Sequence, residues 1–230
     1  MLKLVDTIQT NFSQKELIKT LIETWFNIYN KLPDKENIAI IFSQWSLETG
    51  QGKFCWNYNI GNVKAFDRAN EVIEYCSLKG VWEIVNGKRI ELSVNDPGSW
   101  FRSFATLKKG VDFHLDFLMN KRYKNAWGAI VDGDPVDFSR KLRVQGYYTA
   151  PEAHYTKALV GYFNVFMKSR NFELAIQEVI NDQKPIVLKE IYIESEILPE
   201  ATTPTESTIK AVGFWAKLIE NILSFFKTNP

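Results

Sequence analysis

Residues 34–50 read DKENIAIIFSQWSLETG, and the rest of the chain is expected to pack around this segment. Asp34 can cap a helix because its side chain accepts an early backbone N–H, and Gly50 can end one by adopting a left-handed conformation. Apolar residues recur every three or four positions between them, as in Ile41 and Trp45, so they share one face. The pattern predicts one amphipathic helix.

Glu48 lies near the end of this helix, about one turn after Trp45, and therefore points along the apolar side. Burial disfavours the carboxylate anion, as does the negative end of the helix dipole, so both effects raise the pKa. A glutamic acid that is protonated near neutral pH can donate a proton to a poor leaving group such as a glycosidic oxygen. We therefore predict a general acid at Glu48. The alternative is an ordinary last-turn glutamate that rotates into water.

The loop after this helix combines aromatic rings, amides and a glycine. The candidate substrate-binding residues are Trp56, Asn57, Tyr58, Asn59 and Asn62. Aromatic rings offer apolar faces to sugar C–H groups, and Asn side chains both donate to and accept from hydroxyl and acetamido groups. A polar loop with buried aromatic rings would have the same composition, so both interpretations stay open.

Several segments, in this order, carry a family resemblance: SLETGQGK (46–53) with NYNIGNVKA (57–65), WEIVNGK (82–88), WFRSFATL (100–107) and QGYYTAP (145–151). They resemble the active-site region of bacterial and phage peptidoglycan hydrolases. The chain is most similar to family 73 glycoside hydrolases, the lysozyme-like glucosaminidases and flagellar rod-type muramidases, over roughly residues 35–165. The resemblance implies an α+β, lysozyme-like fold with a mainly helical domain and a small β-hairpin lobe.

The same resemblance implies a glycoside hydrolase that acts on peptidoglycan without a cofactor. The bond cut would lie between N-acetylglucosamine and N-acetylmuramic acid, with Glu48 as the catalytic acid and a second carboxylate on a β-hairpin. Two other functions stay open. One is a lytic transglycosylase that needs a single Glu and yields an anhydro sugar, and the other is a non-catalytic wall-binding or structural virion domain of the same fold.

Two residues compete for the role of second carboxylate. Glu83 lies in a β-rich run followed by Asn86-Gly87, which is a strong signal for a tight hairpin. Glu74 lies in a neighbouring predicted strand around residues 72–76. We favour Glu83 because the hairpin turn follows it. A wide separation from Glu48 would suit inversion of the sugar configuration, and a short one would suit retention.

Three tyrosines belong to the segment similar to the family pattern. Tyr147 is the preferred catalytic contact, since Gly146 lets the chain turn before it, while Tyr148 and Tyr155 are candidate substrate contacts. The chain departs from the family pattern at Ala150, where an Asp is common. The alternative for Tyr147 is a ring that packs one helix against the next.

Composition excludes several classes of function. The chain has 230 residues, 45% hydrophobic content and a formal net charge of +1, so no basic block predicts a nucleic-acid partner. The histidines are isolated and Cys55 and Cys76 are not a close pair, so a zinc site is not expected. A disulfide between the two cysteines has no support in the sequence.

The remaining helices have clear start signals. Ser13 and Glu16 form a capping box for a helix to Asn30, and Thr106 starts another. Asp134-Pro135 opens a helix that ends near Gly146, and Pro151 begins the next.

We divide the chain into a catalytic domain (1–185), an extension with a Pro/Thr-rich linker (186–208) and an amphipathic helix (209–230). The helix is too polar to span a bilayer, so we expect residues 209–227 to dock on a membrane surface, a virion protein or the chain's own domain.

Residues 1–13 lack the apolar core of a signal peptide. Action on the cell wall, in the periplasm or outside, would then fit a phage endolysin released through a holin-type lesion or a virion-associated lysin.

Overall fold

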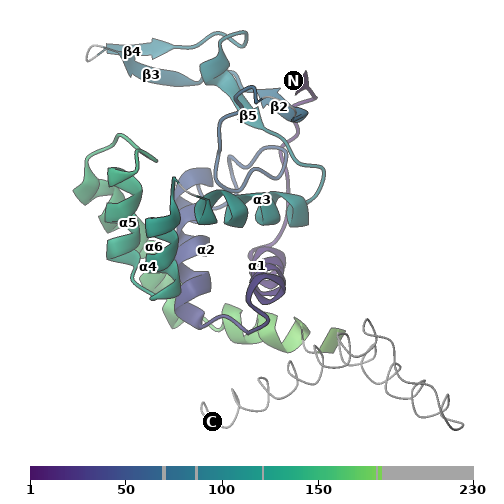
Figure 1. Cartoon of the computed structure of the whole chain (residues 1–230), viewed down its shortest axis with the longest axis vertical. Helices are drawn as coiled ribbons and strands as arrows, with labels where there is room; N and C mark the ends of the chain where they lie inside the picture. Colours follow the sequence, from purple (N-terminus) through teal and green to yellow (C-terminus); the bar gives the residue numbers. More distant parts are fainter. Residues whose placement is uncertain (69–70, 86–87, 121, 180, 183–230) are drawn as a thin grey trace, which may run out of the picture.

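The computed structural model describes residues 1–68, 71–85, 88–120, 122–179 and 181–182. Its labelled helices are α1 (Gln14–Tyr29), α2 (Lys35–Thr49), α3 (Leu107–Met119), α4 (Lys124–Val131), α5 (Pro135–Val144) and α6 (Glu152–Lys168), with a 3₁₀ turn at Pro97–Ser99. Residues 171–179 are helical as well. Its strands are β1 (Leu2–Leu4), β2 (Ile73–Ser77), β3 (Trp82–Val85), β4 (Lys88–Glu91) and β5 (Trp100–Arg102). The predicted α+β architecture, a mainly helical domain with a small β lobe, is confirmed (Figure 1). The linker and the helix predicted beyond residue 185 lie outside the described residues.

Local capping signals set the helix ends where the sequence predicts them. The Ser13 hydroxyl accepts from Glu16 N at 3.1 Å, and the Glu16 carboxylate accepts from Ser13 N at 2.6 Å. Helix α2 ends at Gly50, which adopts the left-handed conformation with φ 57°. Both boundaries follow from hydrogen bonds within a few residues, which is why the sequence alone predicts them.

Helix α2 is buried on nearly every side, so the prediction of an amphipathic helix is wrong. It contacts α1, α4 and α6, and Figure 1 shows it between α1 on one side and α4, α5 and α6 on the other. Even polar side chains in it are buried: Ser43 donates to Ala39 O at 2.6 Å, and Asn37 Nδ2 donates to Ile130 O at 2.7 Å. Because these polar groups find partners inside the protein, the helix can lie at the centre of the core.

The β lobe consists of two small sheets. In the first, β2 pairs with β1 in parallel and with β5 in antiparallel orientation. The second is the β3–β4 hairpin, in which Val85 pairs with Lys88. The hairpin strands agree with the prediction, and the predicted turn at 86–87 lies outside the described residues. Strand β2 is hydrogen-bonded to β1 and β5 and not to the hairpin.

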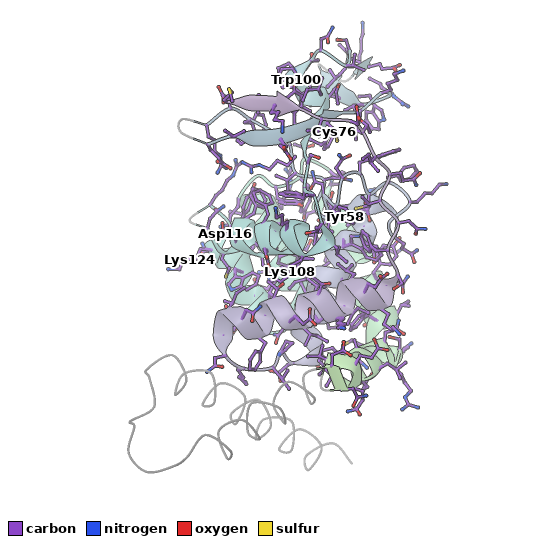
Figure 2. All side chains as sticks on the ribbon, turned by 90° about the vertical axis from the view of Figure 1, so that its right-hand side faces the viewer. Tyr58, Cys76, Trp100, Lys108, Asp116 and Lys124 are labelled. Atoms are coloured by element: carbon purple, nitrogen blue, oxygen red, sulfur yellow. The ribbon has the colours of Figure 1, made fainter. Side chains whose placement is uncertain are left out.

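The loop between α2 and β2 packs against α3 at residue 58. An added Cβ on Gly110 of α3 would lie 2.0 Å from Tyr58 O, so helix and loop backbone are in direct contact there. Figure 2 shows Trp100 and Cys76 in the β lobe and Tyr58 beside α3. Cys55 and Cys76 are both free and buried. Among the described residues, no helix is long and apolar enough to cross a membrane.

Candidate active site

A cavity of about 480 Å³ lies where the end of α2, the loop after it, α3 and the segment before α6 meet. Aromatic rings, amides and cationic groups share its wall. The lining residues are Glu48, Gly61, Asn62, Val63, Lys64, Phe66, Arg68, Arg102, Phe113, Phe117, Asn120, Arg122, Tyr123, Gly146 and Tyr147. A mixed wall of this kind, with a few polar groups among apolar ones, is typical of small-ligand sites.

Glu48 is partly exposed and lines this cavity from the last turn of α2. Burial raises the pKa of its carboxyl from 4.5 to about 7, and a hydrogen bond from Tyr155 opposes the rise. The Tyr155 hydroxyl donates to Glu48 Oε1 at 2.8 Å. Because folding raises the pKa, the folded state favours the protonated acid and loses stability as the pH rises from 4.5 through 7. A substantial fraction of the carboxyl groups is therefore protonated at neutral pH.

Tyr155 is positioned by Tyr148. The two rings stack with centroids 3.8 Å apart and planes 6° from parallel. Tyr148 is buried, and its hydroxyl donates to Ser139 O at 3.1 Å. Neither ring is part of the cavity wall, although both tyrosines were predicted to contact substrate. Tyr148 packs against Tyr155, and Tyr155 contacts the site by its hydrogen bond to Glu48.

Tyr147 lines the cavity, as its assignment as a catalytic contact requires. Its hydroxyl donates to Gly61 O at 3.0 Å. Burial, followed by the nearby Glu48, raises the pKa of Tyr147 well above 10, so the group is a neutral phenol at physiological pH. Tyr147 therefore holds the loop at Gly61 beside the acid.

A buried pair that sequence reasoning missed supports the same loop. His114 Nε2 lies 3.0 Å from Gln44 Oε1, and burial lowers the pKa of His114 to about 4, so its ring is neutral. Gly61 packs on this ring: an added Cβ would lie 2.3 Å from His114 Cε1. Gln44 precedes Glu48 by four residues, about one helical turn, and this spacing is the sequence signal that could have indicated that Gln44 lies near the acid.

Of the five loop residues predicted to bind substrate, only Asn62 lines the cavity. The Asn57 side chain bonds Ile8 N and Asp6 O, both at 2.8 Å. The Asn59 amide donates to Val63 O and Arg102 O, at 2.9 and 3.0 Å.

The structure thus gives Asn57 and Asn59 the task of holding the loop backbone, because buried amides need internal partners. The two aromatic residues of the loop also lie away from Glu48. Trp56 forms a β-bridge with Gln9, while Tyr58 stacks on Phe12 and lines a different cavity.

The two candidate second carboxylates occupy different places. Glu83 is exposed on β3, and an added Cβ on Gly98 would lie 3.3 Å from its Oε1. Burial lowers the pKa of Lys64, which lines the cavity, and the charge of Glu83 opposes that shift. Glu74 is 2.7 Å from Lys3 and lines the cavity that contains Tyr58. The geometry therefore brings Glu83, and not Glu74, towards the wall of the Glu48 cavity.

Comparisons with known proteins give a distant likeness of fold. No family model and no curated protein matches the chain. Among solved structures it is similar to a peptidoglycan hydrolase mutant from Sphingomonas sp. A1, with a TM-score of 0.47 and 18% identity over 71% of this chain and 99% of that one.

It is also similar to a truncated glycoside hydrolase domain of FlgJ from Salmonella typhimurium, with a TM-score of 0.44 and 16% identity over 68% of this chain and 99% of that one. The catalytic domain of the autolysin Auto from Listeria monocytogenes gives a TM-score of 0.43 and 16% identity over 72% and 90%. Similarity at this level does not decide the function, which rests on the site residues.

Proposed function

We propose that this chain hydrolyses the glycan strand of peptidoglycan, between N-acetylglucosamine and N-acetylmuramic acid, with Glu48 as the general acid. The observation that carries the proposal is a carboxyl group with a pKa of about 7 on the wall of a cavity that also presents aromatic rings and amides. The order of the sequence blocks that resemble family 73 hydrolases supports the choice of substrate.

The reaction begins with proton transfer from Glu48 to the glycosidic oxygen, which otherwise leaves poorly. Phe66, which is 63% exposed as a residue, offers an apolar face to a sugar, and Asn62 and Asn120 offer amides to hydroxyl or acetamido groups. The Asn62 amide also donates to Glu48 O, so the loop and the acid are tied together.

In the favoured route, Glu83 acts from the β3–β4 hairpin as the base that activates water, or as a nucleophile, on the other face of the sugar. A second route has its own support. Glu48 is the only carboxylate among the described residues that line the cavity. A lytic transglycosylase needs one acid, so this observation favours it as the second candidate.

The sugar ends released from purified peptidoglycan test these routes. Digestion, borohydride reduction and mass spectrometry should yield reduced N-acetylglucosamine ends for a glucosaminidase and reduced N-acetylmuramic acid ends for a muramidase. Anhydro ends would instead assign a transglycosylase. Absence of any product from folded protein would contradict hydrolysis and favour a wall-binding or structural virion domain.

The proposal also includes the way in which the protein reaches the cell wall. A phage endolysin or a virion-associated lysin would reach the wall through a membrane lesion or on the particle. The test compares lysis by protein added to intact cells with lysis by the same protein after the membrane is permeabilised. Lysis of intact cells would fit delivery from outside on a virion, and lysis only after permeabilisation would fit release through a membrane lesion.

Removal of the Tyr155 hydroxyl should move the pH profile. This hydroxyl stabilises the Glu48 anion and so lowers the pKa of Glu48. In Tyr155→Phe that pKa rises further, and the loss of kcat/KM at the alkaline side should occur at higher pH than in the wild type. Tyr148→Phe is the matched control, because its hydroxyl bonds Ser139 and not Glu48. A shift of equal size in both variants would contradict the role of Tyr155.

A further inference from the structure

Four cationic side chains line the cavity that holds Glu48: Lys64, Arg68, Arg102 and Arg122. The whole chain has a net charge of only +1, so this grouping is not a consequence of a basic composition. Glu48 is the only carboxylate among the described lining residues, and its pKa of about 7 leaves it partly neutral. The residues that form the cavity wall therefore carry an excess of positive charge.

Two of these cations share one carboxylate outside the cavity wall. Arg102 Nη1 lies 3.1 Å from Glu71 Oε1, and Arg68 Nη1 lies 3.9 Å from Glu71 Oε2. The Arg102 guanidinium also lies over the Phe113 ring, 4.5 Å from its centroid, and its side chain is only 8% exposed. Arg102 is thus held inside the protein, whereas the 57% exposed Arg68 side chain stays accessible.

The other two cations contact backbone carbonyls, which hold a cation in place, and Lys64 is in addition attracted by the carboxylates of Glu83 and Asp96. Arg122 Nε donates to Gln145 O at 3.1 Å, and Lys64 Nζ donates to Gly98 O. Within the part of the chain that the structure describes, no carboxylate forms an ion pair with the exposed Arg122. A guanidinium in this state can bind the carboxylate of a ligand.

We propose that the cavity selects glycan strands that carry free carboxylates, and that Arg122, with Arg68 and Lys64, recognises the carboxylate. This inference rests on the proposed function. In peptidoglycan the carboxylate has two sources: the lactyl group of a muramic acid that has lost its stem peptide, and the acidic residues of the stem peptide itself. The neutral rings of Phe66 and Phe117 would contact the sugar whichever source is used.

Binding of four soluble strand preparations, free of teichoic acid, tests the inference. The first has been treated with an amidase, so that its lactyl carboxylates are free, and the second keeps its stem peptides. The third and fourth are the same two preparations with their carboxylates converted to methylamides. Binding is measured with the full-length Glu48→Gln chain, which should not turn the strands over, and cleavage with the wild type.

Conversion to methylamides should weaken binding of the recognised preparation by about tenfold, and the difference should shrink at high salt. Arg122→Gln, introduced into the Glu48→Gln chain, should weaken binding of the anionic strands by about three- to tenfold and leave the neutral strands unchanged. Arg140→Gln is the matched control. This arginine is exposed on α5, pairs with Asp137 and does not line the cavity.

Equal binding of anionic and neutral strands, or an equal effect of Arg122→Gln on both, would overturn the inference. If the wild type then cleaves both kinds of strand at the same rate, the proposed hydrolase stands without the selectivity. If it cleaves neither kind but binds the anionic one selectively through Arg122, the inference stands and hydrolysis falls. Failure to bind any of the four preparations would overturn both.

Discussion

Glu48→Gln is expected to lower the rate of glycan cleavage by about 10²- to 10⁴-fold, the usual contribution of a general acid. Gln has nearly the shape of the protonated acid and can still accept a hydrogen bond from the Tyr155 hydroxyl, so the cavity should keep its form. It has no proton to donate to the glycosidic oxygen. The release of new sugar ends from purified peptidoglycan, at pH 6 to 7, measures the effect.

Glu23→Gln is a matched control for this result. Burial also raises the pKa of Glu23, but this residue belongs to α1 and does not line the cavity. Its replacement should leave the cleavage rate unchanged. Binding of Glu48→Gln to peptidoglycan should match that of the wild type. If folded Glu48→Gln cleaves peptidoglycan at the wild-type rate, Glu48 is not the general acid.

Gly110→Ala is expected to destabilise the folded protein by about 1–3 kcal/mol, as overpacking of a tight contact does. In a helix, alanine is normally more favourable than glycine by about 1 kcal/mol. Helix propensity alone therefore predicts that the substitution raises the unfolding free energy. At this position the new Cβ would lie 2.0 Å from Tyr58 O, and either α3 or the loop must move. Urea unfolding, monitored by far-UV circular dichroism, measures the change in unfolding free energy.

Gly128→Ala supplies the contrast. Apart from its chain neighbours and the backbone of its own helix, no heavy atom lies within 4 Å of a Cβ added at this position of α4, so the substitution should stabilise the protein by up to about 1 kcal/mol. Opposite signs for the two variants would show that the contact between α3 and the loop governs the first. Destabilisation by both, or stabilisation by both, would contradict that explanation.

Much of the fold was predictable from local patterns. The Ser13 capping box, the Thr106 cap and the Asp134-Pro135 start all open helices in the structure. Strands β1 and β5 and helix α4 are among the elements that these patterns did not predict. Strand β1 has three residues, too few for a clear alternation, and α4 has no side-chain cap at its start. Short elements are specified by their partners in the fold, here β2 for the strand and α3 and α5 for the helix.

The residues of the candidate site divide in the same way. Apolar spacing along one helix made Glu48 a candidate acid and left open an ordinary last-turn glutamate, and the structure places Glu48 on the cavity wall. The sequence could not tell which loop amides face the cavity, because Asn57 and Asn59 look identical to Asn62 until their backbone partners are known. The grouping of Arg68 with Arg122 depends on segments more than fifty residues apart.

Local sequence signals located several helix ends, among them those at Ser13, Gly50 and Asp134, together with the β3–β4 strands and an acid in the last turn of α2. These depend on hydrogen bonds and side-chain directions within a few residues, and such interactions are written in the local order of the chain. Only the packed fold reveals that α2 is buried on nearly all sides, that Tyr155 donates a hydrogen bond to Glu48 and that cations line the cavity. Those features arise where distant segments meet, because burial and charge depend on every neighbour that packing brings together.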